Sequence, residues 1–193
     1  VDARRRPKNP MINAGAIVAS SLLLPPVRDV GPEVVETTFA EILAFYSACA
    51  GRQLTLNERV FESEAATGSR NRAIAYMLDS FGALDTHPDA AIALYFRQCA
   101  VQVNTDDLAV MGTTIACGGA NPRTGRRVFS QEVAQRVLSV MTTCGMYDAA
   151  GDWVTAVGMP AKSGVGGGIL AVLPGQLGIG VYSVSYTHLR AHE

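Results

Sequence analysis

Apolar side chains recur every three or four residues along most of the chain, which is the spacing of helices with one buried face. Met11–Leu24 is apolar with small residues and predicts a buried helix that Pro25 and Pro26 end. A second helix is expected to begin at Pro32 and end at Gly51, because proline suits a helix start and glycine suits the residue after its end. Its apolar stripe consists of Val35, Phe39, Ile42, Leu43 and Tyr46.

Capping and breaking residues mark further helices in the middle of the chain. Asn57 is expected to cap a helix that runs to Thr67, and Gly68 breaks it. Two more helices are predicted at Asn71–Ser80 and Asp89–Ala100. This part of the chain therefore reads as a series of short helices.

Two later helices have clear start signals. Thr105 begins the first, with Asp106 and Asp107 at the positive end of the helix dipole, and Gly118-Gly119 stops it. Ser130 caps the second. The residues expected on the core face of that helix are Val133, Val137, Val140 and Met141.

The hydrophobic period changes near the end of the chain. Strands are predicted at Trp153–Val157, Val165–Leu173 and Leu177–Ser183, the last two joined at Pro174-Gly175. Helices followed by strands, without a repeat or a dividing linker, predict an α+β fold.

Composition limits the kinds of protein and of binding partner that fit this chain. The chain has 193 residues, of which 48% are hydrophobic and 17% charged, as expected for a globular domain with a real core. Its net charge of −1 gives no general attraction to nucleic acid or to an anionic membrane. The long uncharged run Ser163–Leu189 is interrupted by glycines and Pro174-Gly175, which favours a hairpin over a membrane span.

The cysteines indicate a reducing compartment. None of the four is in C-x-x-C spacing, so buried reduced thiols in a cytoplasmic protein are the simplest interpretation. No signal peptide is visible, although the chain begins at Val1 without Met, so a lost N-terminus could have carried one.

The last ten residues, 184–193, resemble a translated sequencing adaptor and are set apart from the fold. Without them His87 is the remaining histidine, in the turn-like stretch Asp-Thr-His-Pro-Asp. That is a poor place for the base of a Ser-His-Asp triad, and it leaves no histidine-rich metal site. No metal and no cofactor are predicted.

The stretch Gly158–Leu173 is rich in glycine, and glycines let a bound molecule approach the backbone. It contains Lys162-Ser163-Gly164, a triplet found beside the active site of serine acyl-transferring folds related to the β-lactamases. The triplet alone favours a glycine-rich start of a strand over an active site, because three-residue matches arise by chance.

Several polar residues stand in apolar or small-residue stretches. Asn13 either caps the first helix from inside or meets a ligand, since a buried amide must be hydrogen-bonded. Glu64 and Asn71 flank the break at Gly68, so they are either two solvated helix ends or one cleft suited to the ammonium and carboxylate of an amino acid.

Two tyrosines complete this set of candidates. By default Tyr95 is a core aromatic residue, because it lies in Leu94-Tyr-Phe-Arg97. Tyr147 is expected in a loop between a helix and a strand, where catalytic groups commonly lie.

Taken together, these stretches resemble the serine-dependent glutaminases, which hydrolyse L-glutamine to L-glutamate and ammonia. The matching pieces follow the family's order and cover nearly all of residues 1–183: Asn9-Pro-Met-Ile-Asn-Ala-Gly-Ala-Ile17, Ser63-Glu64 with Gly68 and Arg70-Asn71, Tyr95-Phe96, Cys144-Gly-Met-Tyr-Asp148, and Pro160-Ala-Lys-Ser-Gly-Val165. The resemblance implies a β-lactamase-like or penicillin-binding-protein-like fold with a helical subdomain and part of an antiparallel sheet. By analogy it also implies a homo-oligomer.

The resemblance further implies roles for single residues. The implied substrate-binding residues are Asn13, Glu64, Asn71, Tyr95, Tyr147 and Val165. Glu64 would meet the ammonium group, and Asn71 and Tyr95 would lie near the carboxylate. The implied catalytic groups are Tyr147, which would assist proton transfer, and the backbone N–H of Val165, which would form half of an oxyanion hole.

One departure from the family pattern is serious. The family's nucleophile is the serine of a Ser-x-x-Lys motif, and this sequence has none. Residues 1–183 are therefore expected to be a partial glutaminase domain that is inactive alone, without the nucleophile region and the C-terminal helix. Two alternatives stay open: a β-lactamase-like or penicillin-binding-protein-like acyl transferase, and a non-catalytic amino-acid-binding module.

Overall fold

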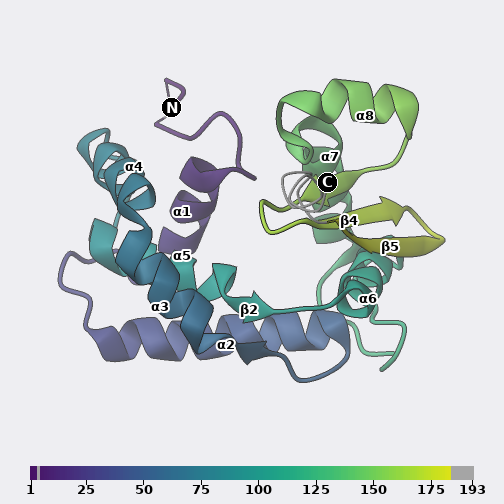
Figure 1. The fold of residues 1–193 in the computed structure, drawn as a ribbon, viewed down its shortest axis with the longest axis horizontal. Coiled ribbons are helices and arrows are strands. Elements are labelled where there is room, and N and C mark those ends of the chain that lie inside the picture. Colours follow the sequence, from purple (N-terminus) through teal and green to yellow (C-terminus); the bar gives the residue numbers. More distant parts are fainter. Residues whose placement is uncertain (4, 184–193) are drawn as a thin grey trace, which may run out of the picture. The chain divides into compact units, whose positions relative to one another are not determined.

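The computed structural model describes residues 1–3 and 5–183 as a mixed α+β structure that is mostly helical (Figure 1). The expected non-native tail, 184–193, lies outside the described residues. The chain forms two compact units: one consists of Val1–Tyr46 and Leu54–Gln102, and the other of Ser47–Gln53 and the chain from Val103 onward. In the described part of the chain, no helix combines the length and the apolar character needed to cross a bilayer.

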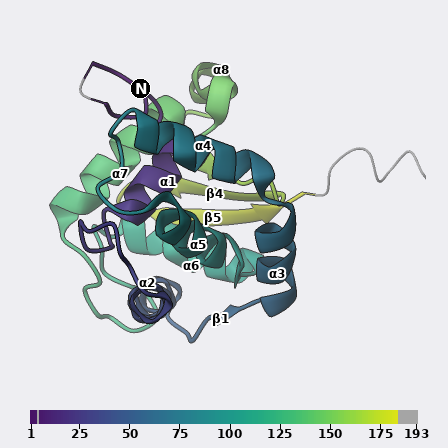
Figure 2. The same cartoon turned by 90° about the vertical axis from the view of Figure 1, so that its left-hand side faces the viewer.

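The first unit is built from helices and one small antiparallel sheet (Figure 2). Its elements are α1 (Asn13–Ser21), α2 (Pro32–Ala50, counted with the second unit from Ser47), β1 (Thr55–Leu56), α3 (Glu58–Thr67), α4 (Ser69–Ser80), α5 (Pro88–Cys99) and β2 (Val101–Gln102). Helix α5 packs against α1, α3 and α4, and β1 pairs with β2. Each strand of this sheet spans only two residues, too short for periodicity to indicate, and the sequence did not predict it.

Local signals place most helix ends where the sequence predicted them. The side chain of Asn57 accepts a hydrogen bond from the N–H of Val60 at 3.1 Å, which caps α3. Gly51 follows α2 with φ of 71°, a left-handed conformation that favours glycine. Both helix ends depend on residues within one helical turn, so the sequence predicted them correctly.

Two apolar clusters form the core of the first unit. One lies between α1, α4 and α5: Ile17, Ala75, Leu78, Leu84, Ala91, Ile92 and Phe96. The other lies between α2 and the opposite side of α5: Leu24, Val35, Phe39, Ile42, Ala90 and Leu94. Helix α5 thus contributes to both clusters, which makes it the central support of this unit.

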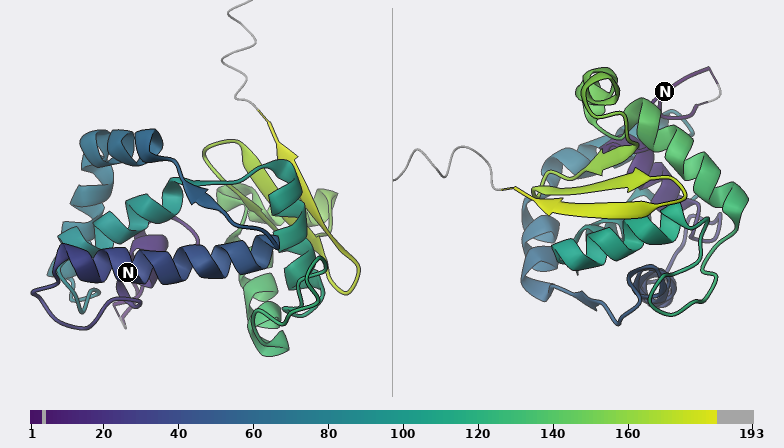
Figure 3. Two further views of the ribbon diagram at one scale, coloured as in Figure 1. Left: turned by 90° about the horizontal axis from the view of Figure 1, so that it is seen from below. Right: turned by 90° about the vertical axis from the view of Figure 1, so that its right-hand side faces the viewer.

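The second unit holds the larger sheet (Figure 3). Its further elements are α6 (Thr105–Ala116), α7 (Gln131–Cys144), the 3-10 helix η1 (Tyr147–Ala149), α8 (Ala150–Ala156), β3 (Ala161–Ser163), β4 (Gly168–Leu173) and β5 (Leu177–Tyr182). The strands are antiparallel in the order β3-β4-β5, with Leu170 opposite Gly180. Helix α6 packs on β5 and β4, so closely that a Cβ on Gly180 would lie 2.1 Å from the Thr105 carbonyl oxygen.

The predicted strand at Trp153–Val157 is wrong. Those residues belong to α8 and to its C-terminal cap, where the N–H of Val157 donates to the Trp153 carbonyl at 2.8 Å. The indole N–H of Trp153 reaches the Met159 carbonyl at 2.8 Å, and Gly158 ends the helix with φ of 75°. A run of β-branched residues favours a strand, but these local hydrogen bonds hold the segment as a helix.

The start of one strand and the buried face of one helix differ from the prediction. The strand predicted from Val165 begins only at Gly168, because a tight turn holds Gly164 to Gly168 through an N–H to carbonyl bond of 2.7 Å. In α7 the residue buried beside Met141 is Ala134, whereas Val133 is 45% exposed. The helix is rotated so that its smallest side chain faces the core.

The cysteines are free thiols, as expected, but only Cys49 is fully buried. Burial raises the pKa of the Cys49 thiol to about 11. Cys99 and Cys117 are exposed, and Cys144 is half-buried, so the prediction of buried thiols is wrong for these positions. Helix ends explain the difference for Cys99 and Cys117, which end α5 and cap α6.

A buried carboxylate anchors the start of α6. The carboxylate of Asp107, fully buried, accepts from the Arg52 Nε at 2.6 Å and from the Asn104 N–H at 2.9 Å. The side chain of Asn104 in turn accepts from the Asp107 N–H at 2.8 Å, which completes a capping box. Hydrogen bonds from the Arg52 guanidinium, more than the opposing effect of burial, lower the pKa of Asp107.

We expect Asp107→Asn to reduce the free energy of unfolding by roughly 1.5–3 kcal/mol, the usual contribution of hydrogen bonds to a charged group. Because the pKa of Asp107 is lowered in the folded state, its contribution is present above the unfolded value near 3.8 and is lost as pH falls through the lower folded value. Urea unfolding between pH 7 and pH 3 measures both effects. Asp106→Asn, next to it and exposed, is the matched control. Equal stabilities for the two variants would contradict this account.

Candidate functional site

Asn13 and Asn71 are joined directly in the first unit. Asn13 is the first residue of α1, and its Nδ2 donates to the Oδ1 of Asn71 on α4 at 2.6 Å. Ile12 is the N-cap of α1, and no side chain caps the helix there, so the interpretation of Asn13 as an internal cap is wrong. The two half-buried amides form one polar pair between two helices.

Glu64 lies across the helix break from this pair. It occupies the last turn of α3, Asn71 occupies the first turn of α4, and Gly68 separates the two helices. A Cβ on Gly68 would lie 2.3 Å from the ring of the buried Phe96, so no larger residue fits the break without a shift. Asn71 is held by Asn13 rather than being a solvated helix end, and Glu64 is half-buried.

Tyr95 is half-buried on α5, where it packs against the first core cluster. Its environment is shared with Cys99, one turn later, and with Glu64. Although Cys99 as a residue is exposed, the protein around its thiol desolvates it and raises its pKa; a hydrogen bond from Tyr95 opposes this rise, and the negative charge of Glu64 adds to it. Tyr95 is thus a core aromatic residue whose hydroxyl bonds to Cys99, a thiol that the charge of Glu64 also affects.

Tyr147 lies in the second unit, at the start of η1 directly after α7. It is one of two described non-glycine residues with positive φ, at 55°, a conformation that costs energy and is more common at functional sites than elsewhere. Its ring is 37% exposed, and the Lys162 Nζ on β3 lies 4.3 Å from the ring centroid. The predicted loop is therefore a short 3-10 helix in which a cation packs over the ring.

Val165 stands in the turn between β3 and β4 and is 96% exposed. No acceptor within residues 1–3 and 5–183 takes a hydrogen bond from its backbone N–H. The strand β3 that precedes the turn is tied to the end of α7 by a bond from the Ser163 N–H to the Gly145 carbonyl at 3.3 Å. Strand β3 thus links the segment after α7 that holds Tyr147 to the turn that holds Val165.

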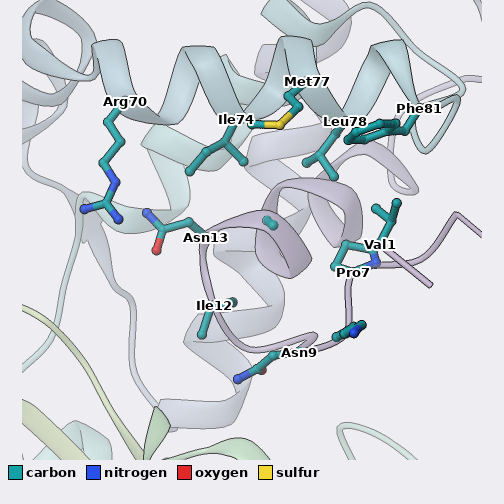
Figure 4. Close-up of a pocket in the computed structure, with 12 residues that line it drawn as sticks. Val1, Pro7, Asn9, Ile12, Asn13, Arg70, Ile74, Met77, Leu78 and Phe81 are labelled. Atoms are coloured by element: carbon teal, nitrogen blue, oxygen red, sulfur yellow. The ribbon is translucent and has the colours of Figure 1, made fainter. Parts of the chain in front are cut away.

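A cavity of about 420 Å³ opens beside Asn13 in the first unit (Figure 4). Asn13 and Arg70 lie at one end of it, and apolar side chains of α4 line the other. Those of α4 are Ile74, Met77 and Leu78, and Phe81, the C-cap of α4, lies beside them. Of the predicted site residues only Asn13 lines this cavity. Among the described residues no group of three or more His, Cys, Asp or Glu side chains is placed to hold a metal ion.

The glutaminase family model matches residues 1–186 of the chain. This chain belongs to the glutaminase family. The family match replaces the alternative of a β-lactamase-like or penicillin-binding-protein-like acyl transferase, which rested on short motifs alone.

This chain is also similar to curated relatives that are named as glutaminases. It is 51% identical over 178 residues to Glutaminase 2 of Bradyrhizobium diazoefficiens, covering 92% of this chain and 27% of the relative. It is 48% identical to the glutaminase of Microcystis aeruginosa, covering 92% of this chain and 51% of that one. The chain thus spans about half or less of the curated relatives it matches.

Solved structures are similar in fold to this chain. Mglu in its glutamate form superposes with a TM-score of 0.84 at 47% identity, covering 94% of this chain and 41% of that one. The probable glutaminase ybaS superposes with a TM-score of 0.83 at 43% identity, covering 91% and 54%. The similarity again concerns part of each longer chain.

Two residues beside the candidate site of the glutaminase chain were not singled out from the sequence. Cys99 stands one helical turn after Tyr95, so the i, i+4 spacing was a usable signal. Lys162 was noted only as part of a triplet. Its contact with the Tyr147 ring joins β3 to the end of α7, a tertiary pairing that local sequence does not indicate.

Proposed function

We propose that this chain is part of a glutaminase that hydrolyses L-glutamine to L-glutamate and ammonia through a serine acyl-enzyme, on a β-lactamase-like fold. The observation that carries the proposal is the bonded pair Asn13 and Asn71, with Glu64 across the break at Gly68. Two amides and a carboxylate, each half-buried, suit both charged ends of a free amino acid.

Each binding residue has a role consistent with its place. Glu64 would accept hydrogen bonds from the substrate ammonium group, because an ionised carboxylate is an acceptor only. Asn71 and Tyr95 would serve the carboxylate end, and Asn13 would hold Asn71 through the bond of 2.6 Å. All four come from the first unit, so binding and chemistry rest on different parts of the chain.

The chemistry follows from acyl transfer. An activated serine attacks the side-chain amide carbon of glutamine and forms a tetrahedral intermediate. A neighbouring lysine and Tyr147 pass the serine proton to the ammonia that departs as the C–N bond breaks, and the N–H of Val165 donates to the developing oxyanion. Water then hydrolyses the glutamyl-enzyme.

The serine itself is expected outside this sequence. No serine here is followed three residues later by lysine, and the curated relatives are about twice as long or longer. We therefore propose that residues 1–183 are a partial glutaminase domain, and that 184–193 are not native to it. Self-association into a homo-oligomer is carried over from the family and is checked by light scattering.

A non-catalytic amino-acid-binding module is the second candidate function. It is favoured by one observation: Asn13, Glu64, Asn71 and Tyr95 all lie in the first unit, apart from the residues proposed for chemistry. A chimera of two homologues, called the exchange protein below, distinguishes the two functions. In it, residues 1–183 replace the matching segment of the Microcystis aeruginosa glutaminase, and ammonia release from L-glutamine is measured. Turnover supports the glutaminase, whereas binding of L-glutamine without turnover supports the module.

Glu64→Gln in the exchange protein should raise KM for L-glutamine by roughly tenfold or more, because a hydrogen bond to a charged group is lost. The change keeps the shape of the side chain and removes its charge. An analogue without the α-amino group should be affected far less. Glu62→Gln, exposed on the same helix, is the control and should leave KM unchanged. Equal losses for L-glutamine and the analogue would refute the assignment of Glu64.

A further inference from the structure

The helix break at Gly68 is held by a side chain that the proposed mechanism does not use. The Nη2 of Arg72, on the first turns of α4, donates to the backbone carbonyl of Ala65 on α3 at 2.6 Å. In an unbroken helix that carbonyl would accept from the amide four residues later. The guanidinium takes the place of this amide and puts a cation at the C-terminal end of α3, where the helix dipole favours it.

The same guanidinium is fixed from a third helix. Its central carbon lies 5.5 Å from the ring centroid of Phe96 on α5, and Phe96 is 1% exposed. The ring also fills the space beside Gly68, where a Cβ would lie 2.3 Å from it. Arg72 and Phe96 therefore hold the break from two sides, and neither can move without disturbing the other.

The bond links the neighbours of two proposed binding residues. Ala65 directly follows Glu64, and Arg72 directly follows Asn71. We propose that Arg72 is a positioning residue that sets the separation of Glu64 and Asn71, and with it the fit of both charged ends of the substrate. This inference rests on the proposed function of that pair.

The kinetic test uses the exchange protein. Arg72→Gln should raise KM for L-glutamine by about tenfold, the effect of losing a hydrogen bond from a charged group, and leave kcat within about threefold. Arg72→Lys should recover part of the loss, because its ammonium can donate to the carbonyl but lacks the planar group that packs over Phe96. Arg59→Gln, exposed on α3, is the control and should change neither constant.

A second test uses the chain itself and needs no activity. In hydrogen exchange, amides of residues 62–68 should exchange faster in Arg72→Gln than in the unchanged chain, since the last turn of α3 loses its anchor. Arg59→Gln should leave their exchange unchanged. An exchange protein without turnover would refute the proposed function and the substrate-positioning role with it, whereas the hydrogen exchange of this segment tests the anchoring of α3 by Arg72 independently.

Two results would overturn the role of Arg72. Unchanged protection of residues 62–68 would show that Arg72 does not anchor α3. A fall in kcat together with a lower Tm, at constant KM, would show that Arg72 supports stability only.

Discussion

Tyr147→Phe should lower kcat of the exchange protein by roughly 10²–10⁴-fold, the usual contribution of a positioned acid–base group. The ring and its contact with Lys162 stay, and only the hydroxyl is lost. KM should change little, because the lost interaction acts mainly in the transition state. Ammonia release at saturating L-glutamine measures the effect.

The structure supports a functional reason for this residue. Its backbone has φ of 55°, although a tyrosine gains nothing from a left-handed conformation, and its ring is 37% exposed rather than buried in the core. A purely packing tyrosine would not require either feature. Tyr182→Phe, on β5 and 62% exposed, is the matched control and should keep kcat unchanged. A kcat for Tyr147→Phe within about threefold of the unchanged protein would reduce Tyr147 to a packing residue.

Residues 1–193 alone should release no ammonia from L-glutamine. The expected loss is complete because the chemistry needs a nucleophile, and the sequence has no Ser-x-x-Lys. The measurement compares purified chain with a heat-treated sample over several hours. The exchange protein, which regains the motif from its partner sequence, is the positive control.

The outcome separates two explanations of the missing motif. Turnover by the chain alone would show that another group in residues 1–193 acts as nucleophile, and the serine proposal would fail. No turnover by the chain together with turnover by the exchange protein would place the reactive serine outside this sequence, as proposed.

The sequence determined the features that depend on neighbouring residues. The cap at Asn57 and the start at Pro32 were predicted because each depends on contacts within one or two helical turns, and the break at Gly68 was predicted because glycine favours a helix end. The glutaminase family was also recognisable, because its motifs keep their order along the chain. Trp153–Val157 shows the limit of local pattern: a β-branched run resembles a strand, but bonds within its own turn make it a helix.

Tertiary structure decided how the site residues are held. Asn13 and Asn71 are far apart in the sequence and form one bond because α1 and α4 pack together. Arg72 of α4 bonds to Ala65 of α3 across a break where Phe96, from a third helix, leaves room only for glycine. Lys162 meets Tyr147 because β3 returns to the end of α7. Spacing along the chain cannot predict these contacts, since each depends on the packing of separate elements.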